Sequence, residues 1–279
     1  MEIKFEHVNF IIDTYTPLEK TILSDVSFCI KGPGIYSFVG KSNSGKTAIG
    51  DLINALVVPN SGLVKVGDFV NNKKRIKNIN KLRCNTGYVF RNPYDMLFNS
   101  SVRKELEFGM RYFKYKTKNI KERVNNALKL VDLDPSLLNM YPQNLDLVDA
   151  KKLALASTLV YNPEVIILDE YTNGLTYSDK KEFIRIVKLL KNKYKRTIII
   201  LTKDTDLSYE ISDYVYLMEK TKIVTHGDKR ILRDSELLKS IGLKVPSIVS
   251  FIEEYKKKSN IDDYSNILDL IKGVYRDVL

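Results

Sequence analysis

The feature that most constrains the fold is a glycine- and serine-rich loop that joins an apolar segment to a helical one. Residues 35–39 form an apolar run that predicts a buried strand, and residues 48–57 predict a helix directly after the loop. The loop matches the phosphate-binding P-loop at every fixed position and has the strand-to-helix context that this motif requires. Its residues and the first residue of the predicted helix are the expected nucleotide-binding set: Gly40, Lys41, Ser42, Asn43, Ser44, Gly45, Lys46, Thr47 and Ala48.

The residue types of this loop suit the binding of ATP with Mg²⁺. Glycines allow the backbone to wrap around phosphates with its N–H groups inward, and the positive end of the following helix faces the same anion. We expect Lys46 to neutralise the β- and γ-phosphates and the Thr47 hydroxyl to bind Mg²⁺. ATP and Mg²⁺ are therefore the predicted cofactors.

An acidic pair ends a second apolar segment further along the chain. Residues 165–168 predict a buried strand, and Asp169 and Glu170 follow directly. We expect Asp169 to hold Mg²⁺, directly or through water, and Glu170 to act as general base on the attacking water. Such a strand ending indicates little alone, but after a P-loop and a helical segment it predicts hydrolysis of ATP.

Strand and helix patterns alternate along most of the chain. The first third is rich in strand-like segments, and the middle is helical, with apolar residues at helical spacing. Alternation then returns, and one helix face is marked by Phe183, Val187, Leu190 and Tyr194. This order implies an α/β fold on a mainly parallel sheet with helices on its faces. From residue 228 the sequence is helical and charged, which predicts a small domain at the carboxyl terminus.

The net charge of +11 has three interpretations. A basic protein can bind nucleic acid or an anionic membrane face, or its lysines can reflect composition alone. The lysines are spread out, with small clusters at residues 73–75 and 256–258, and no basic stripe is interleaved with aromatic residues, so we expect no nucleic acid partner. No apolar run approaches the ~18 residues of a membrane span, so we expect the chain not to cross a membrane by itself. Cys29 and Cys84 lack metal-type spacing and are expected to be reduced thiols of a cytosolic protein.

The order of the segments resembles the ABC ATPase family across nearly the whole chain. It is most similar to the ATPase subunits of energy-coupling factor transporters, which take up vitamins and metal ions. Three stretches carry this closer resemblance, residues 16–20, 92–98 and 242–246; the second reads Asn-Pro-Tyr-Asp-Met-Leu-Phe, where the family has Asn-Pro-Asp-Asp-Gln-Leu-Phe. The resemblance implies a P-loop ABC ATPase core at residues 1–227, a mixed sheet with helices on both faces. It also implies an inserted helical subdomain near residues 94–161, and a small C-terminal helical dimerisation domain at residues 228–279.

The resemblance also implies partners. Two ATPase subunits form a dimer beneath a transmembrane scaffold subunit, at the cytoplasmic face of the membrane, and a separate membrane subunit binds the substrate. Two ATP molecules lie between the ATPase subunits, each held by the P-loop of one and the signature segment of the other. Asp95 lies where the family has a carboxylate and is the expected contact with a basic side chain of the scaffold. Alternatively, Asp95 is a solvated residue that caps the next helix.

Several positions depart from the family pattern. The glutamine that touches Mg²⁺ and the attacking water falls on Arg91, and the switch histidine falls on Lys203; a protonated cation accepts no hydrogen bond. A family aspartate falls on Thr176. The signature Leu-Ser-Gly-Gly-Gln falls on residues 145–149, where Asp146 and Asp149 bring carboxylates toward an anion, although Asp146 can still cap the following helix. These departures predict reduced hydrolysis with nucleotide binding retained.

The aromatic residue that stacks on adenine in the family falls on Ile12, and Tyr15 or Phe10 could take its place.

Three functions are consistent with these features of the sequence. The first is a transport ATPase subunit in an asymmetric heterodimer with a more complete partner. The second is a nearly inactive, ATP-binding structural subunit. The third, a soluble ABC protein of DNA repair or translation, is disfavoured because such proteins usually carry a coiled-coil insertion, zinc-binding cysteines or two ABC domains.

Overall fold

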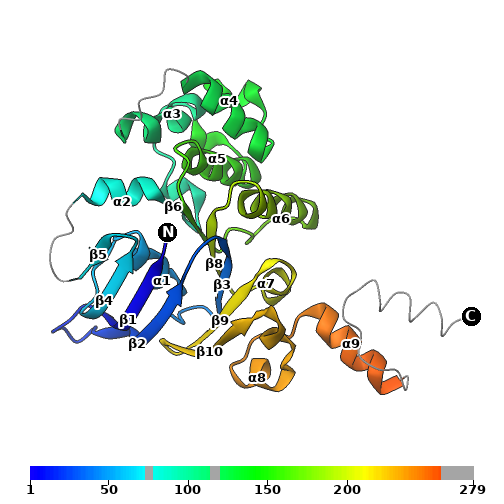
Figure 1. The fold of residues 1–279 in the computed structure, drawn as a ribbon. Coiled ribbons are helices and arrows are strands. Elements are labelled where there is room, and N and C mark those ends of the chain that lie inside the picture. The colour runs from blue at the N-terminus through cyan, green and yellow to red at the C-terminus, as the bar shows by residue number, and fades with distance from the viewer. Residues whose placement is uncertain (73–77, 114–119, 259–279) are drawn as a thin grey trace, which may run out of the picture.

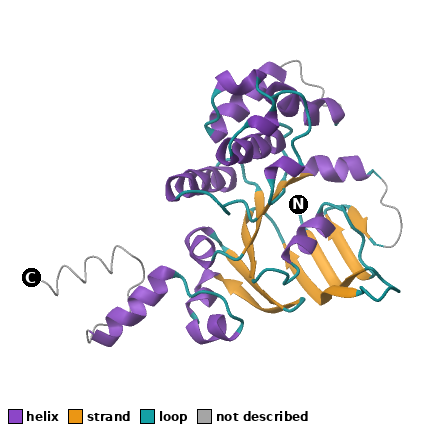
Figure 2. Cartoon of the chain, turned by 180° about the vertical axis from the view of Figure 1, so that it is seen from behind, coloured by secondary structure: helices purple, strands orange, loops and turns teal. Residues whose placement is uncertain are grey.

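The computed structural model describes residues 1–72, 78–113 and 120–258, and its strands form two sheets (Figure 1, Figure 2). One sheet has six strands in the order β10-β9-β3-β8-β7-β6, and the other has four in the order β2-β1-β4-β5. The strands are β1 (Ile3–Ile12), β2 (Lys20–Ile30), β3 (Gly34–Gly40), β4 (Ser61–Val66), β5 (Phe69–Asn71), β6 (Thr86–Val89), β7 (Val165–Asp169), β8 (Thr197–Thr202), β9 (Tyr214–Glu219) and β10 (Lys222–Asp228).

The helices fall into groups that cover the sheets or stand apart from them. Helices α3, α4 and α5 form a helical subdomain, drawn at the top of Figure 1. The α-helices are α1 (Lys46–Ile53), α2 (Ile79–Asn85), α3 (Val102–Tyr112), α4 (Ile120–Val131), α5 (Leu147–Leu159), α6 (Tyr177–Asn192), α7 (Thr205–Ile211), α8 (Ser235–Ser240) and α9 (Ser247–Lys258).

The six-stranded sheet places the P-loop strand β3 between β8 and β9. Its strands pair in parallel except at the edge, where β10 runs antiparallel to β9. All residues of β7 and β8 are buried, because helices cover one face of the sheet and α1 with the second sheet covers the other. The predicted α/β class and the mainly parallel sheet are confirmed.

The four-stranded antiparallel sheet is a separate layer that was not predicted. Its inner face packs, together with α1, against the six-stranded sheet in one hydrophobic core. Aromatic rings join the two sheets there. Phe28 of β2 meets Phe38 of β3 edge-on with ring centroids 5.0 Å apart, and its ring lies 5.2 Å from that of Tyr216 on β9. This core fixes α1, and with it the P-loop, between the two sheets.

The residues that follow β10 pack on the six-stranded sheet. Leu232, Leu238 and Ile241 are buried against Leu217 of β9 in a small hydrophobic cluster. Strand β10 runs to Asp228, one residue past the boundary predicted at residue 227. The division into two domains stays a prediction, and residues 259–279 and 73–75 lie outside the described part of the chain.

Two predicted helical features are wrong. Helix α1 ends at Ile53 and not at residue 57, because the Asn54 amide donates to Thr86 O at 2.5 Å and to Thr86 Oγ1 at 2.9 Å. Ala55 then adopts a φ of 53°, outside the right-handed helical region. Tyr194 lies beyond the end of α6, and 41% of its surface is exposed.

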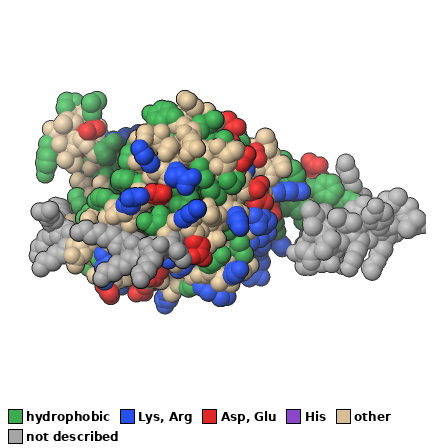
Figure 3. All heavy atoms as spheres, turned by 90° about the horizontal axis from the view of Figure 1, so that it is seen from above, with side chains coloured by type: hydrophobic (Ala, Val, Ile, Leu, Met, Phe, Trp, Pro, Cys, Tyr) green, Lys and Arg blue, Asp and Glu red, His purple; other side chains and the backbone are tan. Residues whose placement is uncertain are grey.

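The surface has features that bear on membrane and nucleic acid partners. No helix within the described ranges is long and apolar enough to cross a bilayer. On the face drawn in Figure 3, Lys and Arg side chains lie in several groups among apolar and acidic ones. The expected absence of a nucleic acid partner stays a prediction.

Candidate nucleotide-binding site

The P-loop joins the end of β3 to α1 along a path that requires glycine at two positions. Gly45 has a φ of 97°, and a Cβ there would lie 2.7 Å from the carbonyl oxygen of Ile22. A Cβ on Gly40 would lie 2.5 Å from the carbonyl oxygen of Met218. Because neither residue carries a side chain, the loop passes close to β2 and β9 and turns directly into α1.

Lys46 opens α1 and has its side chain buried at the loop. Its Nζ donates to Gly40 O at 2.8 Å and to Lys41 O at 2.7 Å, and lies 3.9 Å from Glu170 Oε1. Burial lowers the pKa of Lys46, and the carboxylates of Glu170 and Asp169 oppose that shift. The ammonium group is therefore held where an added anion would interact with it in a poorly solvated setting.

Thr47 and Asp169 meet where α1 begins and β7 ends. Thr47 Oγ1 donates to Asp169 Oδ2 at 2.8 Å. Asp169 Oδ1 is buried and, within the described residues, has no hydrogen-bond partner; the same holds for Ser44 Oγ in the loop. Burial raises the pKa of Asp169, whereas the hydrogen bond from Thr47 and the charge of Lys46 lower it. A hydroxyl beside a carboxylate oxygen without a partner is a set of oxygen donors that fits Mg²⁺.

Glu170 follows with its backbone in the left-handed region, at a φ of 43°. Its N–H donates to Leu201 O at 2.8 Å. Burial raises the pKa of the Glu170 carboxyl, and the Lys46 ammonium opposes this shift. A carboxylate with a raised pKa is a better proton acceptor near neutral pH, which suits the predicted general base.

Two cavities border Glu170, and each carries one of the cations that depart from the family pattern. The smaller, of about 190 Å³, lies between the P-loop, Asp169, Glu170 and Arg91. The larger, of about 770 Å³, includes Glu170 and Lys203 in its wall. Burial raises the pKa of the Asp169 and Glu170 carboxyls, and the charge of Arg91 opposes that rise. The structure thus brings Arg91 and Lys203 close to Glu170, and their predicted effect on hydrolysis stays a prediction.

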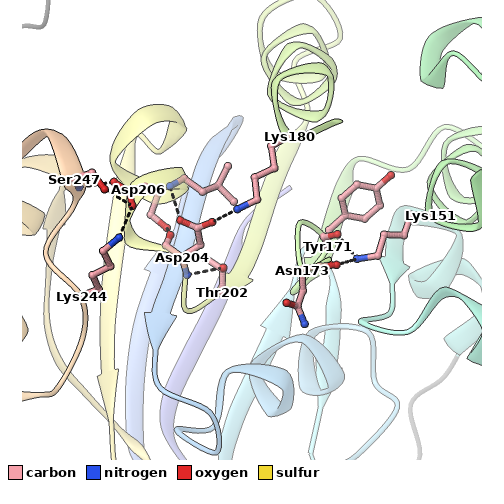
Figure 4. Close-up of polar contacts among 11 residues, drawn as sticks. Lys151, Tyr171, Asn173, Lys180, Thr202, Asp204, Asp206, Lys244 and Ser247 are labelled. Atoms are coloured by element: carbon pink, nitrogen blue, oxygen red, sulfur yellow. Dashed lines mark hydrogen bonds and ion pairs between the residues drawn. The ribbon is translucent and has the colours of Figure 1, made fainter. Parts of the chain in front are cut away.

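The segment that precedes α9 closes one side of the larger cavity. Gly242, with a φ of 64°, lies so close to the Lys41 ammonium that a Cβ on residue 242 would overlap with it. Asp206, at the start of α7, accepts hydrogen bonds from Ser247 N at 2.5 Å and Ser247 Oγ at 3.2 Å (Figure 4). The carboxyl-terminal segment therefore contacts both the P-loop and the residues that follow Lys203.

The predicted signature residues lie away from this chain's own P-loop. Asp146 caps α5 as predicted, and its Oδ1 accepts from Asp149 N at 2.9 Å. Burial raises the pKa of Asp149, and the Asp146 carboxylate adds to this shift. Neither carboxylate lines the two cavities at the P-loop. Their predicted role toward a second subunit stays a prediction.

Thr176 and Asp95 also lie outside the two cavities. Thr176 caps α6 in a capping box with Asp179; Thr176 Oγ1 donates to Asp179 Oδ2 at 2.6 Å, and Asp179 N donates back to Thr176 Oγ1 at 3.3 Å. Asp95 is exposed and accepts from Asn92 Nδ2 at 2.7 Å. It does not cap the next α-helix, because the N-cap of α3 is Ser101.

The residues considered for adenine stacking do not line the smaller cavity. Ile12 is 37% exposed at the end of β1, Tyr15 is fully exposed, and Phe10 packs against the core. Strand β2 instead contributes Lys20 and Ile22 to the cavity wall. These two residues were not predicted, because a strand pattern in sequence does not show which end of a strand another sheet approaches. The identity of a stacking residue stays a prediction.

A half-buried carboxylate on α1 should make stability depend on pH. Burial raises the pKa of Asp51 to about 6, and the Tyr88 hydroxyl opposes that shift. The folded state then holds this proton more tightly than the unfolded chain, so stability is lost as the pH rises from about 4 through 6. We expect Asp51→Asn to raise the free energy of unfolding at pH 7 by on the order of 1 kcal/mol, discounted for partial exposure, and to leave it unchanged at pH 4. Urea denaturation at both pH values measures this; an exposed control, Asp68→Asn, should change neither value.

The connectivity identifies the class of ATPase. The acidic pair on β7 reaches the P-loop across β8, and a helical subdomain lies between β6 and β7. Together with the antiparallel sheet beside α1, this order defines an ATPase of the ABC cassette class. The family model described as "ABC transporter" matches residues 23–173, more than half of the chain.

Relatives place the chain more narrowly. The energy-coupling factor transporter ATP-binding protein EcfA3 of Oenococcus oeni is 32% identical over 92% of this chain and 90% of its own length. EcfA2 of Streptococcus sanguinis is 31% identical over 98% of this chain and 99% of its own. The chain belongs to the ABC transporter family and, within it, to the energy-coupling factor transporter ATP-binding proteins.

Solved structures agree with the fold. CbiO1 of Clostridium perfringens, part of the ABC transporter complex CbiONQ, matches with a TM-score of 0.72 at 28% identity, over 90% of this chain and 98% of that one. The dimeric cassette MJ0796 in a post-hydrolysis state with ADP and phosphate matches with a TM-score of 0.75 at 21% identity, over 82% of this chain and 99% of that one. The predicted fold class and ATPase family are confirmed.

Proposed function

We propose that this chain binds Mg-ATP on its own P-loop and hydrolyses it slowly, as one ATPase subunit of an energy-coupling factor importer. The observation that carries the proposal is the Thr47–Asp169 pair, which leaves a buried carboxylate oxygen without a partner beside Lys46. The names of the relatives support the transporter type. The family resemblance gives the cargo as a vitamin or a metal ion.

The roles follow from the geometry. Lys46 exchanges its carbonyl partners in the loop for the β- and γ-phosphates, whose charge it neutralises. Thr47 and Asp169 hold Mg²⁺, which when bound supplies positive charge to the phosphate oxygens. Glu170 orients the attacking water and accepts its proton, because burial raises the pKa of its carboxyl.

Arg91 and Lys203 are proposed to slow this step. Both flank Glu170 and present only donors, so neither accepts a hydrogen bond from the attacking water. Their positive charges attract the γ-phosphate, which favours nucleotide binding. Because neither accepts a hydrogen bond from the attacking water, Glu170 alone positions that water. Binding is therefore retained while the geometry for attack is incomplete.

The acidic signature segment is proposed to act on a second subunit. At the start of α5, Asp146 and Asp149 place carboxylates where the family offers a serine and backbone N–H groups to the partner's nucleotide. In a homodimer, the Asp146 and Asp149 carboxylates would repel the nucleotide phosphates at both sites. In a heterodimer, a partner with a complete signature would contact the nucleotide on this chain's P-loop without that repulsion. We therefore propose a heterodimer rather than a homodimer.

A second function is a structural subunit that binds ATP and barely hydrolyses it. The placement of two cations at Glu170 favours this alternative. The two functions differ only in rate, and turnover of the purified complex separates them.

The proposed setting is the cytoplasmic face of the membrane, beneath a transmembrane scaffold subunit that also carries a substrate-binding membrane subunit. Asp95 is the proposed contact with the scaffold, because its exposed carboxylate has one partner, Asn92, and is open to a second donor. Copurification of the full chain from its native membrane, followed by identification of the proteins that accompany it, tests the setting.

Asp95→Arg is expected to release the chain from the membrane subunit while ATP binding is retained. A basic group opposite a basic coupling segment weakens the contact by about 2 kcal/mol or more, roughly 30-fold in affinity. Pull-down of the complex from detergent measures retention. The charge-matched control is Asp68→Arg, in the turn between β4 and β5. Full retention of the scaffold by Asp95→Arg would show that Asp95 is an ordinary surface residue.

A further inference from the structure

Lys151 is a buried cation that the proposed mechanism leaves unused. It lies on the second turn of α5, and only 3% of its surface is exposed. Its Nζ donates to the carbonyl oxygens of Tyr171 and, at 2.7 Å, Asn173 (Figure 4). Both carbonyls belong to the loop that directly follows Glu170. A buried ammonium group with two carbonyl partners is a charge-assisted contact whose loss leaves buried acceptors unsatisfied.

We infer that Lys151 is a positioning residue, whose ammonium group holds the loop after Glu170 against α5 and thereby sets the position of the Glu170 carboxylate. The loop is short and tightly turned. Asn173 N donates to Glu170 O at 3.0 Å, so a shift at residues 171–173 displaces Glu170 as well. Tyr171 stacks on Phe183 of α6 at 4.7 Å, which anchors the ring while Lys151 anchors the backbone.

The same contact connects the loop to the start of α5. A Cβ on Gly174 would lie 2.9 Å from Leu147 Cδ2, so the first turn of α5 touches the loop at a second point. Asp146 caps that turn. Movement of the α5 terminus is therefore transmitted through Lys151 to Glu170, and movement of Glu170 is transmitted back. The inference rests on the proposed function only for its effect on hydrolysis.

Electrostatics agree with this geometry. Burial lowers the pKa of Lys151 to about 8, and the Glu170 carboxylate opposes that shift. The two charges therefore interact, although Lys151 reaches the loop through backbone atoms and not through the carboxylate itself.

Hydrogen–deuterium exchange on the full-length, nucleotide-free chain tests the loop contact. Lys151→Met keeps the length of the side chain and removes its donors, so amides at residues 171–175 should exchange about 10-fold faster. Lys151→Gln, which keeps an N–H donor, should recover part of the protection. The matched control is Lys152→Met, because the partly exposed Lys152 donates to Asp132 O on the subdomain instead and should leave the loop unchanged. Unchanged exchange at residues 171–175 in both Lys151 variants would overturn the inference, as would faster exchange spread evenly over β7 and β8.

Kinetics separate positioning from simple support of the fold. Lys151→Met should lower kcat for ATP by about 10²-fold and leave KM within about threefold, because the P-loop contacts are intact. A proportional change in both constants, or a normal kcat with a loosened loop, would contradict a positioning role. If the unmodified chain binds no Mg-ATP, the proposed function fails, while the exchange measurement still decides whether Lys151 holds the loop.

Discussion

Lys46→Ala is expected to reduce the affinity for Mg-ATP by roughly 10- to 150-fold, because one charge-assisted contact to phosphate contributes roughly 1.5–3 kcal/mol. The effect should be large here, since the ammonium group is 6% exposed and already has its donors directed at the loop. Isothermal titration of the full-length chain measures it.

The control for this variant is Lys65→Ala, an exposed lysine on β4 that carries the same charge away from the site. Its nucleotide affinity should match that of the unmodified chain. Thermal unfolding of both variants checks that the fold survives. Equal affinity with and without Lys46 would show that residues 40–47 are not the nucleotide site.

Arg91→Gln combined with Lys203→His is expected to raise hydrolysis at this chain's own site by about 10²-fold or more. The change replaces two groups that only donate with groups that accept a hydrogen bond from water, and one positioned catalytic group is worth about that factor. The assay uses the heterodimer, in which the catalytic glutamate of the partner subunit has been changed to glutamine, so that only this chain turns over. Turnover of the unmodified chain near 10 s⁻¹, about the median for enzymes, that is lost in Glu170→Gln would contradict the assignment.

A reciprocal variant tests whether each site is shared between subunits. Restoring the signature with Asp146→Ser, Leu147→Gly, Val148→Gly and Asp149→Gln should raise hydrolysis at the partner's site, measured with Glu170→Gln in this chain. The Arg91 and Lys203 changes should act when the partner's catalytic glutamate is replaced, and the signature changes should act when Glu170 is replaced. If each set of changes had the same effect whichever subunit carried the glutamate-to-glutamine change, a site shared between subunits would be refuted.

The sequence identified the parts of the site that depend on local spacing. The P-loop, Asp169 and Glu170 were predictable because a strand ending in fixed residues brings them to the same sheet edge. The cap at Asp146 was predictable because capping needs only a neighbouring backbone N–H. The long helix predicted after the P-loop was wrong because Asn54 bonds to Thr86, a residue 32 positions away that no local pattern reveals.

The contacts that depend on packing could not be predicted. The strands of the antiparallel sheet were recognisable, but their grouping into a second layer follows from the core around Phe28 and Tyr216. Lys151 reads in sequence as an ordinary lysine beside Lys152, and only burial against residues 171–173 distinguishes the two. Asp51 likewise gains its raised pKa from tertiary burial.

The close approach of Gly242 to Lys41 makes the far end of the chain part of the environment of the P-loop. A shortened protein that stops before residue 242 would remove the backbone that lies beside the Lys41 ammonium group and would give this exposed side chain additional rotamers. The nucleotide affinity of the shortened protein would therefore be measured on a P-loop whose Lys41 side chain differs in conformation from that of the full-length protein. Replacement of Gly242 by any residue with a side chain would displace the end of the Lys41 side chain in the intact protein, so the carboxyl-terminal segment restricts the conformation of a P-loop residue from outside the loop.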